Sequence, residues 1–397
     1  MTWREWLAQQ AALRDVTGLR RELRPRAVDD AFVDLAGNDY LGLSQHPVVR
    51  GAAAEAAVTW GAGAGASRLV TGTLDLHREL ETELAAYTRR PAALLFSTGY
   101  AANLGVLQAL AGRDAYVVSD AHVHASLVDA VRVSRTPYQV VPHNDWRAVD
   151  AALAQAEGRR ALVLVESVYS VLGDEAPLLS MAHVCDDHGA LLVVDEAHAL
   201  GVLRAGLVYA ASLAGEDFVV STATLSKAFG SQGGAVLGSQ AVVDQLVNTA
   251  RSFIYDTGLA PAATAAALAA LRIVRDDPMI TRTVELRVDE LAAALGVEPP
   301  HGAVISVPMP TPQAAVAAQA AARAQGVLVG CFRPPSVPDG VSRLRITVNA
   351  GVTDDHWGRA VEVLVAVVKE HGTTPQNHSV HALRARSSRF RGDPGET

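Results

Sequence analysis

Short apolar runs alternate with longer amphipathic segments between about residue 90 and residue 275. Each run is followed by polar residues or glycine, and then by a stretch with helical spacing. Continuous apolar strands that alternate with helices are typical of a largely parallel sheet covered on both faces, so the pattern predicts an α/β fold. The predicted strands are Ala92 to Phe96, Ala115 to Ser119, Ala161 to Val165, Ala190 to Val194 and Phe218 to Val220.

The pattern changes in the last part of the chain, where shorter strands and Ala-rich or amphipathic helices predict a small α+β unit. Strands are expected at 304–307, 326–332 and 342–348, and helices at 312–325 and from 353 to about 371.

These patterns predict the division of the chain into domains. We expect a large domain over 46–275 and a small C-terminal domain over 276–371. Residues 1–45 would form an amphipathic helix and a connecting segment. The Arg-rich tail 372–397 lacks periodicity, so we expect it to be disordered.

Composition narrows the class of protein. With 397 residues, of which 49% are hydrophobic, the chain can bury a large core. The net charge of -8 argues against a general nucleic-acid surface and against attraction to anionic membranes. We expect neither a signal peptide nor a membrane span, because no apolar run approaches roughly 20 residues. Cys185 and Cys331 lack the spacing of a zinc site and fit a reducing compartment, so we expect a cytoplasmic protein.

The chain contains only two lysines, Lys227 and Lys369, although Lys and Arg together number 34. Arginine is always protonated, whereas a lysine in an apolar pocket can lose its proton and form a Schiff base. A biased composition alone could also leave a lone lysine. Lys227, however, lies in TLSKAFGSQGG (Thr224 to Gly234), which predicts a strand, then a lysine loop, then a glycine turn.

Polar residues also follow other predicted strands. Asp195 and His198 lie in DEAH directly after an apolar strand, where a half-buried carboxylate needs a partner such as a protonated heterocyclic nitrogen. Helicases share these letters, but the chain lacks the GxxxxGK[ST] motif. Gly99 and Tyr100 would lie at a helix N-terminus, which suits a phosphate, although an ordinary strand-to-helix connection explains them too.

Three other segments have more than one interpretation. His122 and His124 have the HxH spacing of metal ligands, but no carboxylate lies at a ligand-like spacing, so both can equally be loop histidines. The basic segment Leu19 to Arg26 is either a solvated face or a clamp for an anion. Gly61 to Arg68 (GAGAGASR) is not a dinucleotide fingerprint, because the segment before it predicts a helix.

The combined motifs resemble the α-oxoamine synthases, fold type I pyridoxal 5'-phosphate (PLP) enzymes that join an amino acid to an acyl thioester. The resemblance covers roughly residues 1–370 in unbroken order. It is carried by NDYLGLS from Asn38, STGYAANL from Ser97, SDAHVHAS from Ser119, ESVYSVLGDEAPL from Glu166, VVDEAHALG from Val193, TLSKAFGSQGG, FIYDTGLAP from Phe253 and FRPPSVPDGVSRLRIT from Phe332.

The resemblance implies a role for each residue around the PLP ring. Lys227 would be the Schiff-base lysine and the acid/base at the substrate α-carbon. Asp195 would pair with the pyridinium nitrogen, His198 would bond to the phenolic oxygen, and His124 would stack on the ring. The phosphate and the pocket wall would involve Gly99, Tyr100, Thr224, Ser170, Glu166 and, from the other subunit of a homodimer, Thr257.

The resemblance also implies the substrates. These would be L-alanine and pimeloyl-CoA, or pimeloyl-carrier protein, with loss of CO2. Arg333 and Asn38 would hold the amino-acid carboxylate, Arg20 the acyl carboxylate, and Ser67 would favour alanine over glycine. Glycine C-acetyltransferase, 5-aminolevulinate synthase, sphingoid-base synthase and a non-catalytic PLP-binding protein remain alternatives. No metal is expected.

The chain departs from the family pattern at Thr98, Leu172 and Ala199, whereas Asp174 is retained. We expect these departures to affect loop geometry more than chemistry.

Overall fold

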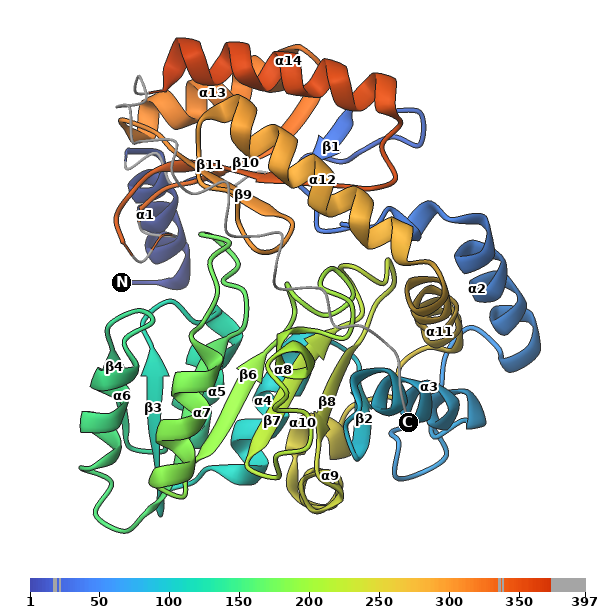
Figure 1. Ribbon diagram of the computed structural model, residues 1–397, viewed down its shortest axis with the longest axis vertical. Coiled ribbons are helices and arrows are strands. Elements are labelled where there is room, and N and C mark those ends of the chain that lie inside the picture. Colours follow the sequence, from blue (N-terminus) through green and yellow to red (C-terminus); the bar gives the residue numbers. More distant parts are fainter. Residues whose placement is uncertain (17–19, 21–22, 335–336, 338, 373–397) are drawn as a thin grey trace, which may run out of the picture. The chain divides into compact units, whose positions relative to one another are not determined.

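The structure is a computed structural model that describes residues 1–16, 20, 23–334, 337 and 339–372 (Figure 1). The chain divides into two compact units, residues 1–32 and residues 33–397. The first unit contains helix α1 (Trp3–Val16), which buries none of its side chains. From residue 373 on, the predicted disordered tail lies outside the described residues. Within the described ranges, no helix is long and apolar enough to cross a membrane.

The larger sheet has seven strands in the order β2-β8-β7-β6-β5-β3-β4. Strands β3 to β7 run parallel to one another, and only β8 is antiparallel to both of its partners, β2 and β7. The prediction of a largely parallel sheet is therefore confirmed. The strands are β2 (Ala92–Phe96), β3 (Ala115–Asp120), β4 (Tyr138–Val141), β5 (Arg160–Glu166), β6 (Leu191–Asp195), β7 (Val219–Thr224) and β8 (Gly234–Gly238).

The sequence did not predict β4 and β8, for different physical reasons. Strand β4 lies at the edge of the sheet and is half exposed, so its apolar run is short. Strand β8 begins at Gly234, which we had predicted to belong to a turn. A Cβ atom on Gly234 would collide with the carbonyl oxygen of Thr98, so glycine is needed there for close packing and not for a turn.

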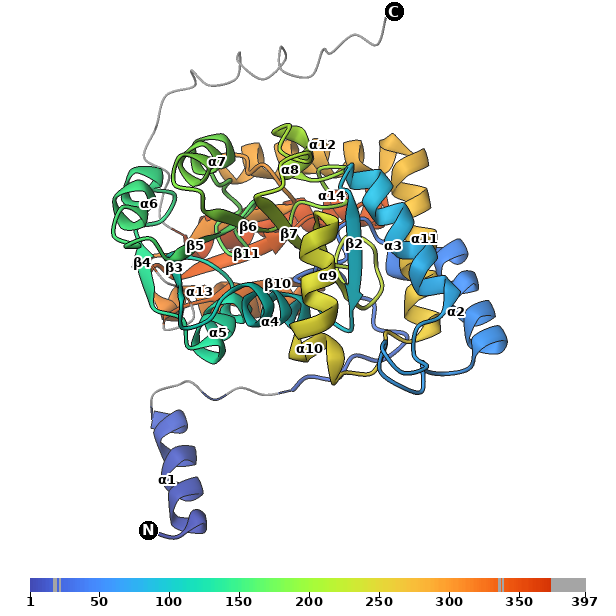
Figure 2. The same ribbon diagram turned by 90° about the horizontal axis from the view of Figure 1, so that it is seen from below.

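Helices cover both faces of this sheet (Figure 2). Alternate residues of β5 show why, because Leu162 and Leu164 pack in one apolar cluster while Val163 and Val165 pack in another. The first face carries α4 (Gly99–Leu110), α5 (Ala125–Ser134), α9 (Gln240–Thr249) and α10 (Arg251–Ile254). The second carries α6 (Trp146–Leu153), α7 (Leu178–Asp187) and α8 (Leu207–Ala210). Helix α3 (Asp75–Thr88) lies beside β2, and its buried leucines belong to a third apolar cluster.

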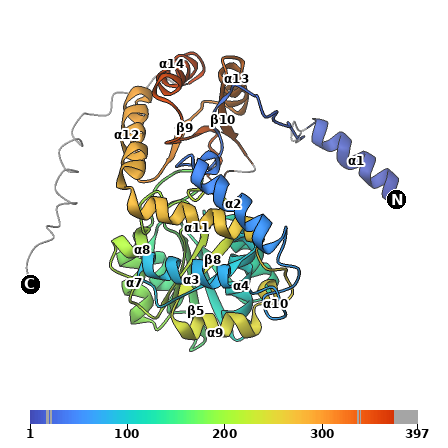
Figure 3. The same cartoon turned by 90° about the vertical axis from the view of Figure 1, so that its right-hand side faces the viewer.

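A second sheet of four strands, in the order β1-β10-β11-β9, forms the predicted α+β unit (Figures 1 and 3). Strand β1, from the beginning of the second unit, pairs in parallel with β10, and the other pairs are antiparallel. Its elements are β1 (Val33–Leu35), β9 (Val304–Pro308), β10 (Val327–Phe332), β11 (Arg343–Thr347), α12 (Pro278–Leu295), α13 (Pro312–Ala324) and α14 (Asp354–His371).

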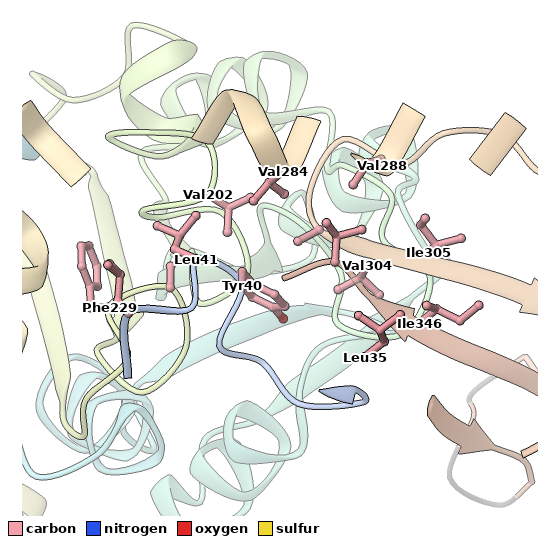
Figure 4. Packing of buried hydrophobic residues seen from close by; sticks show 14 of the residues in the cluster. Leu35, Tyr40, Leu41, Val202, Phe229, Val284, Val288, Val304, Ile305 and Ile346 are labelled. Atoms are coloured by element: carbon pink, nitrogen blue, oxygen red, sulfur yellow. The ribbon is translucent and has the colours of Figure 1, made fainter. Parts of the chain in front are cut away.

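One apolar cluster joins the two sheets through the segment that follows β1 (Figure 4). Tyr40 and Leu41 are buried in this cluster between Ile346 of the small sheet and Phe229 of the lysine loop. The cluster also includes residues of α2 (Pro47–Trp60) and α11 (Pro261–Asp276), and the short helix η1 (Leu43–Gln45) contributes Leu43. The packing therefore fixes the lysine loop against both sheets.

Gly230 is a position at which this loop tolerates no side chain. Its φ is +58°, and a Cβ atom would collide with the backbone nitrogen of Ser44 and lie 2.6 Å from the carbonyl carbon of Leu43.

We predict that Gly230→Ala costs about 2–4 kcal/mol of unfolding free energy, from backbone strain plus overpacking. Gly158→Ala is the matched control, because Gly158 also has a positive φ but has nothing within 4 Å. It should cost only about 1 kcal/mol. Urea unfolding of both variants measures the difference, and equal costs would contradict the packing argument.

Candidate active site

Polar residues end four neighbouring parallel strands of the larger sheet. Asp120, Glu166, Asp195 and Thr224 are the last residues of β3, β5, β6 and β7. Because these strands run parallel, their carboxyl ends meet at one edge of the sheet, where open α/β sheets bind their ligands. Glu166 and Asp195 are directly paired in register, so their side chains leave the same face.

Lys227 lies on the loop between β7 and β8, and its amine contacts His198. The distance from Lys227 Nζ to His198 Nε2 is 3.0 Å, and His198 Nδ1 lies 2.7 Å from the hydroxyl of Tyr40. Burial lowers the pKa of Lys227, although Asp195 and Glu166 oppose that shift. Burial, together with the nearby Lys227, holds the pKa of His198 well below its usual value.

These contacts fix the tautomer of a neutral His198. The hydroxyl of Tyr40 donates to Asn38 Oδ1 at 3.0 Å, so it can only accept from the imidazole. His198 Nδ1 therefore carries the proton, and Nε2 accepts a hydrogen bond from the amine of Lys227.

Asp195 is held by two donors and linked to His124 through a short polar chain. Its carboxylate accepts from Asn103 Nδ2 at 2.8 Å and from the backbone N–H of Ala197 at 2.9 Å. Asn103 Nδ2 also donates to Ser126 Oγ at 2.8 Å, which lies 2.7 Å from His124 Nδ1. Sequence reasoning missed Asn103 and Ser126, although polar residues on the buried faces of α4 and α5 were a usable signal.

Glu166 is the second buried carboxyl group of the site, with 1% of its surface exposed. Its Oε2 accepts from the backbone N–H of Ser170 at 3.1 Å, while Oε1 completes no hydrogen bond with any described residue. Burial, reinforced by the charge of Asp195, raises the pKa of Glu166 well above its usual value. Glu166 is therefore the neutral member of the pair.

The N-terminus of α4 lies against Thr224. Thr98 caps the helix by accepting from the N–H of Ala101 at 3.0 Å, so the departure at position 98 preserves the cap. A Cβ atom on Gly99 would lie 3.1 Å from Cβ of Thr224, so these two residues touch. The side-chain hydroxyl of Tyr100 donates to Asp129 at 2.8 Å. The backbone N–H of Tyr100 lies in the first turn of the helix, where N–H groups have no partner within the helix.

Asn38 is held by an arginine that sequence reasoning did not single out. Arg345 of β11 donates from Nη2 to Asn38 Oδ1 at 3.0 Å and from Nε to the carbonyl oxygen of Ser170 at 2.6 Å. Arg345 lies in a strand whose residues are all buried, and an arginine at such a position was the signal that the sequence offered. Arg333, the predicted carboxylate ligand, is half-buried directly after β10.

Two further predicted residues, Thr257 and Arg20, pair with residues near them. Thr257 is exposed and forms an isolated bridge with Ser67, while the neighbouring Asp256 accepts from Ser97. Arg20 belongs to the first unit, where it pairs with Asp15 at 3.5 Å. Across the described part of the chain, no three His, Cys, Asp or Glu side chains are arranged to hold a metal ion.

Comparisons with known proteins identify the family. A model of class I and II aminotransferases matches residues 30–364. The 8-amino-7-oxononanoate synthase of Mycolicibacterium smegmatis is 55% identical over 367 residues, which cover 91% of this chain and 96% of the relative.

Solved structures give the same result. The K265A variant of serine palmitoyltransferase from S. paucimobilis, solved with a PLP–myriocin aldimine bound, has a TM-score of 0.83 and 27% identity, covering 93% of this chain and 99% of that one. The 8-amino-7-oxononanoate synthase of Francisella tularensis has a TM-score of 0.72 and 25% identity, covering 86% and 99%. These matches confirm the fold, the PLP cofactor and the resemblance that the motifs indicated. The chain therefore belongs to the 8-amino-7-oxononanoate synthases, acyltransferases within the PLP-dependent class I and II aminotransferase family.

Proposed function

We propose that this enzyme condenses L-alanine with the pimeloyl group of pimeloyl-CoA or pimeloyl-carrier protein. It would release CO2 and a free thiol and give 8-amino-7-oxononanoate for biotin biosynthesis. The observation that carries the proposal is the state of Lys227, a half-buried lysine whose amine donates to a neutral imidazole and to no carboxylate of a described residue. A lysine held in this way can act as a nucleophile and then as a base.

The residues around Lys227 fit PLP. Asp195 is only 5% exposed, and a buried carboxylate is stabilised by a cation such as a pyridinium nitrogen. The backbone N–H groups of Gly99 and Tyr100, in the first turn of α4, suit a phosphate. When bound, PLP supplies an electron-withdrawing ring that eases removal of the proton on the substrate α-carbon.

The side chains would divide the work around the ring. Asp195 would keep the ring nitrogen protonated, and His124 would lie against the ring face. Lys227 would hold the cofactor through its amine, then take the proton from the substrate α-carbon and later return one. His198 would orient that amine through the 3.0 Å contact. The phosphate would be held by backbone N–H groups of Gly99 and Tyr100 and by the Thr224 hydroxyl, with Ser170 at the pocket wall.

The substrate would be held by side chains next to the strands of the small sheet and by side chains of the segment that follows β1. Arg333 and Asn38 would bind the alanine carboxylate, and the hydrogen bond from Arg345 would orient Asn38. Arg20 would bind the distal carboxylate of the pimeloyl group. Thr257 would reach the phosphate from the other subunit, so we also propose a homodimer, working in the cytoplasm.

A sphingoid-base synthase is the second candidate. The serine palmitoyltransferase superposes with a higher TM-score than the Francisella synthase, 0.83 against 0.72. The 55% identity to the Mycolicibacterium synthase outweighs this, because the serine palmitoyltransferase reaches only 27%. Thiol release from pimeloyl-CoA with alanine, compared with palmitoyl-CoA with serine, separates the two candidates.

Lys227→Ala tests the proposed reaction most directly. We predict that it abolishes the visible absorption band of bound PLP and lowers thiol release from pimeloyl-CoA and L-alanine by at least about 100-fold, because the nucleophile and the base are lost together. Lys369→Ala is the matched control, since Lys369 is the only other lysine and is exposed on α14. Ordinary turnover in Lys227→Ala, or equal losses in both variants, would refute the proposal.

Glu166→Gln tests the neutral state of Glu166 in the PLP-free protein. The folded pKa lies above the usual value of 4.5, so the folded chain keeps a proton that the unfolded chain loses as pH rises above 4.5. Wild-type stability should therefore fall relative to the variant between pH 5 and pH 8, with a slope of at most about 1.4 kcal/mol per pH unit. Urea unfolding across this range measures the gap. Exposed Glu298→Gln should show no such trend, and a wild-type stability that stays level or rises with pH relative to Glu166→Gln would contradict the assignment.

A further inference from the structure

The loop after β4 places His143 between two carboxylates close to the candidate active site. His143 Nδ1 lies 2.9 Å from Asp120 Oδ1 and 3.2 Å from Asp120 Oδ2, and Nε2 lies 2.8 Å from Asp174 Oδ2. A neutral imidazole carries one N–H, so only the protonated ring can donate at both ends. The geometry therefore requires an imidazolium.

The groups that face this ring from the neighbouring segments also favour the protonated state of His143. His122 stacks on His143 with ring centroids 3.9 Å apart, and Tyr169 contacts it edge-on at 4.4 Å. Burial would lower the pKa of His143, but the hydrogen bonds to Asp120 and Asp174 outweigh it and raise the pKa to about 9. Burial lowers the pKa of His122, which leaves the stacked ring uncharged.

The two carboxylates belong to loops that carry other residues of the site. Asp120 ends β3 and also accepts from the backbone N–H groups of His122 and Asn144, both at 2.7 Å. Four residues later the chain reaches His124. The carbonyl oxygen of Asp174 accepts from the N–H of Tyr169 at 2.9 Å, directly before Ser170. One ring thus connects the loops after β3, β4 and β5, which are adjacent in the sheet.

We propose that His143 is a positioning residue whose protonated ring ties the Asp120 loop to the Asp174 loop and so holds His124 and Ser170 around the PLP site. The inference rests on the proposed roles of His124 and Ser170. Its readout is PLP binding, so a failure of thiol release from pimeloyl-CoA would refute the proposed reaction and leave this inference standing.

The test compares PLP dissociation constants of wild type and His143→Gln, titrated into PLP-free protein at several pH values. A glutamine amide cannot donate to both carboxylates, so we expect binding about tenfold weaker than wild type at pH 7.5. The ratio of the two constants should approach one by pH 10, because the wild-type ring has then lost its proton. Effects of pH on Lys227 are common to both proteins and cancel in the ratio.

His301→Gln is the matched control. His301 Nδ1 pairs with Glu175 at 2.6 Å, next to Asp174, but its side chain is 49% exposed. The ratio for this variant should stay near one at every pH. A His143→Gln ratio that is constant from pH 7.5 to pH 10, or equal to one at pH 7.5, would overturn the proposal. If His143→Gln does not fold, Asp174→Asn is measured instead. This variant should bind PLP more weakly than wild type at pH 7.5 and equally at pH 10. Unchanged PLP affinity at pH 7.5 would overturn the proposal.

Discussion

The contact between the Lys227 amine and Nε2 of His198 is the interaction on which the rest of the site depends. It requires a neutral imidazole whose proton is on Nδ1, and the hydroxyl of Tyr40 enforces that tautomer. Tyr40 is in turn fixed because its ring is buried in the apolar cluster between the two sheets. The position of one amine is therefore set by a core that includes parts of both sheets.

At the same edge of the large sheet, Glu166 and Asp195 are neighbouring buried carboxyl groups that face one lysine. Ionising both would leave an uncompensated negative charge in a buried place. The local donors decide which group keeps the charge, because Asp195 accepts two hydrogen bonds from protein donors while Glu166 accepts one. Register pairing between β5 and β6 forces the two groups together, so the protonation of Glu166 follows from the fold.

The sequence pattern predicted the buried central strands of the large sheet but missed two of its strands, β4 and β8. Strands covered on both faces show continuous apolar runs, whereas edge strand β4 and glycine-bounded β8 do not. The placement of Lys227, Asp195 and His198 at the carboxyl edge of the large sheet was predictable, because each follows a predicted strand in the sequence. Asn103 and Arg345 are polar residues at buried positions, which could have marked them as candidates, but their roles depend on partners 92 and 307 residues away in the chain. Local periodicity carries no information about such contacts.

Arg345 shows how the small sheet influences chemistry on the large one. Its hydrogen-bond acceptors are the amide oxygen of Asn38, the hydroxyl of Tyr40 and the carbonyl of Ser170, all uncharged. Its positive charge is therefore not neutralised by these acceptors, and it adds to burial in lowering the pKa of both His198 and Lys227. Strand β11 thus has an electrostatic effect as well as a structural one. Because the guanidinium also bonds to the Ser170 loop, a single side chain contributes both to the docking of the small sheet and to the lowering of the lysine pKa.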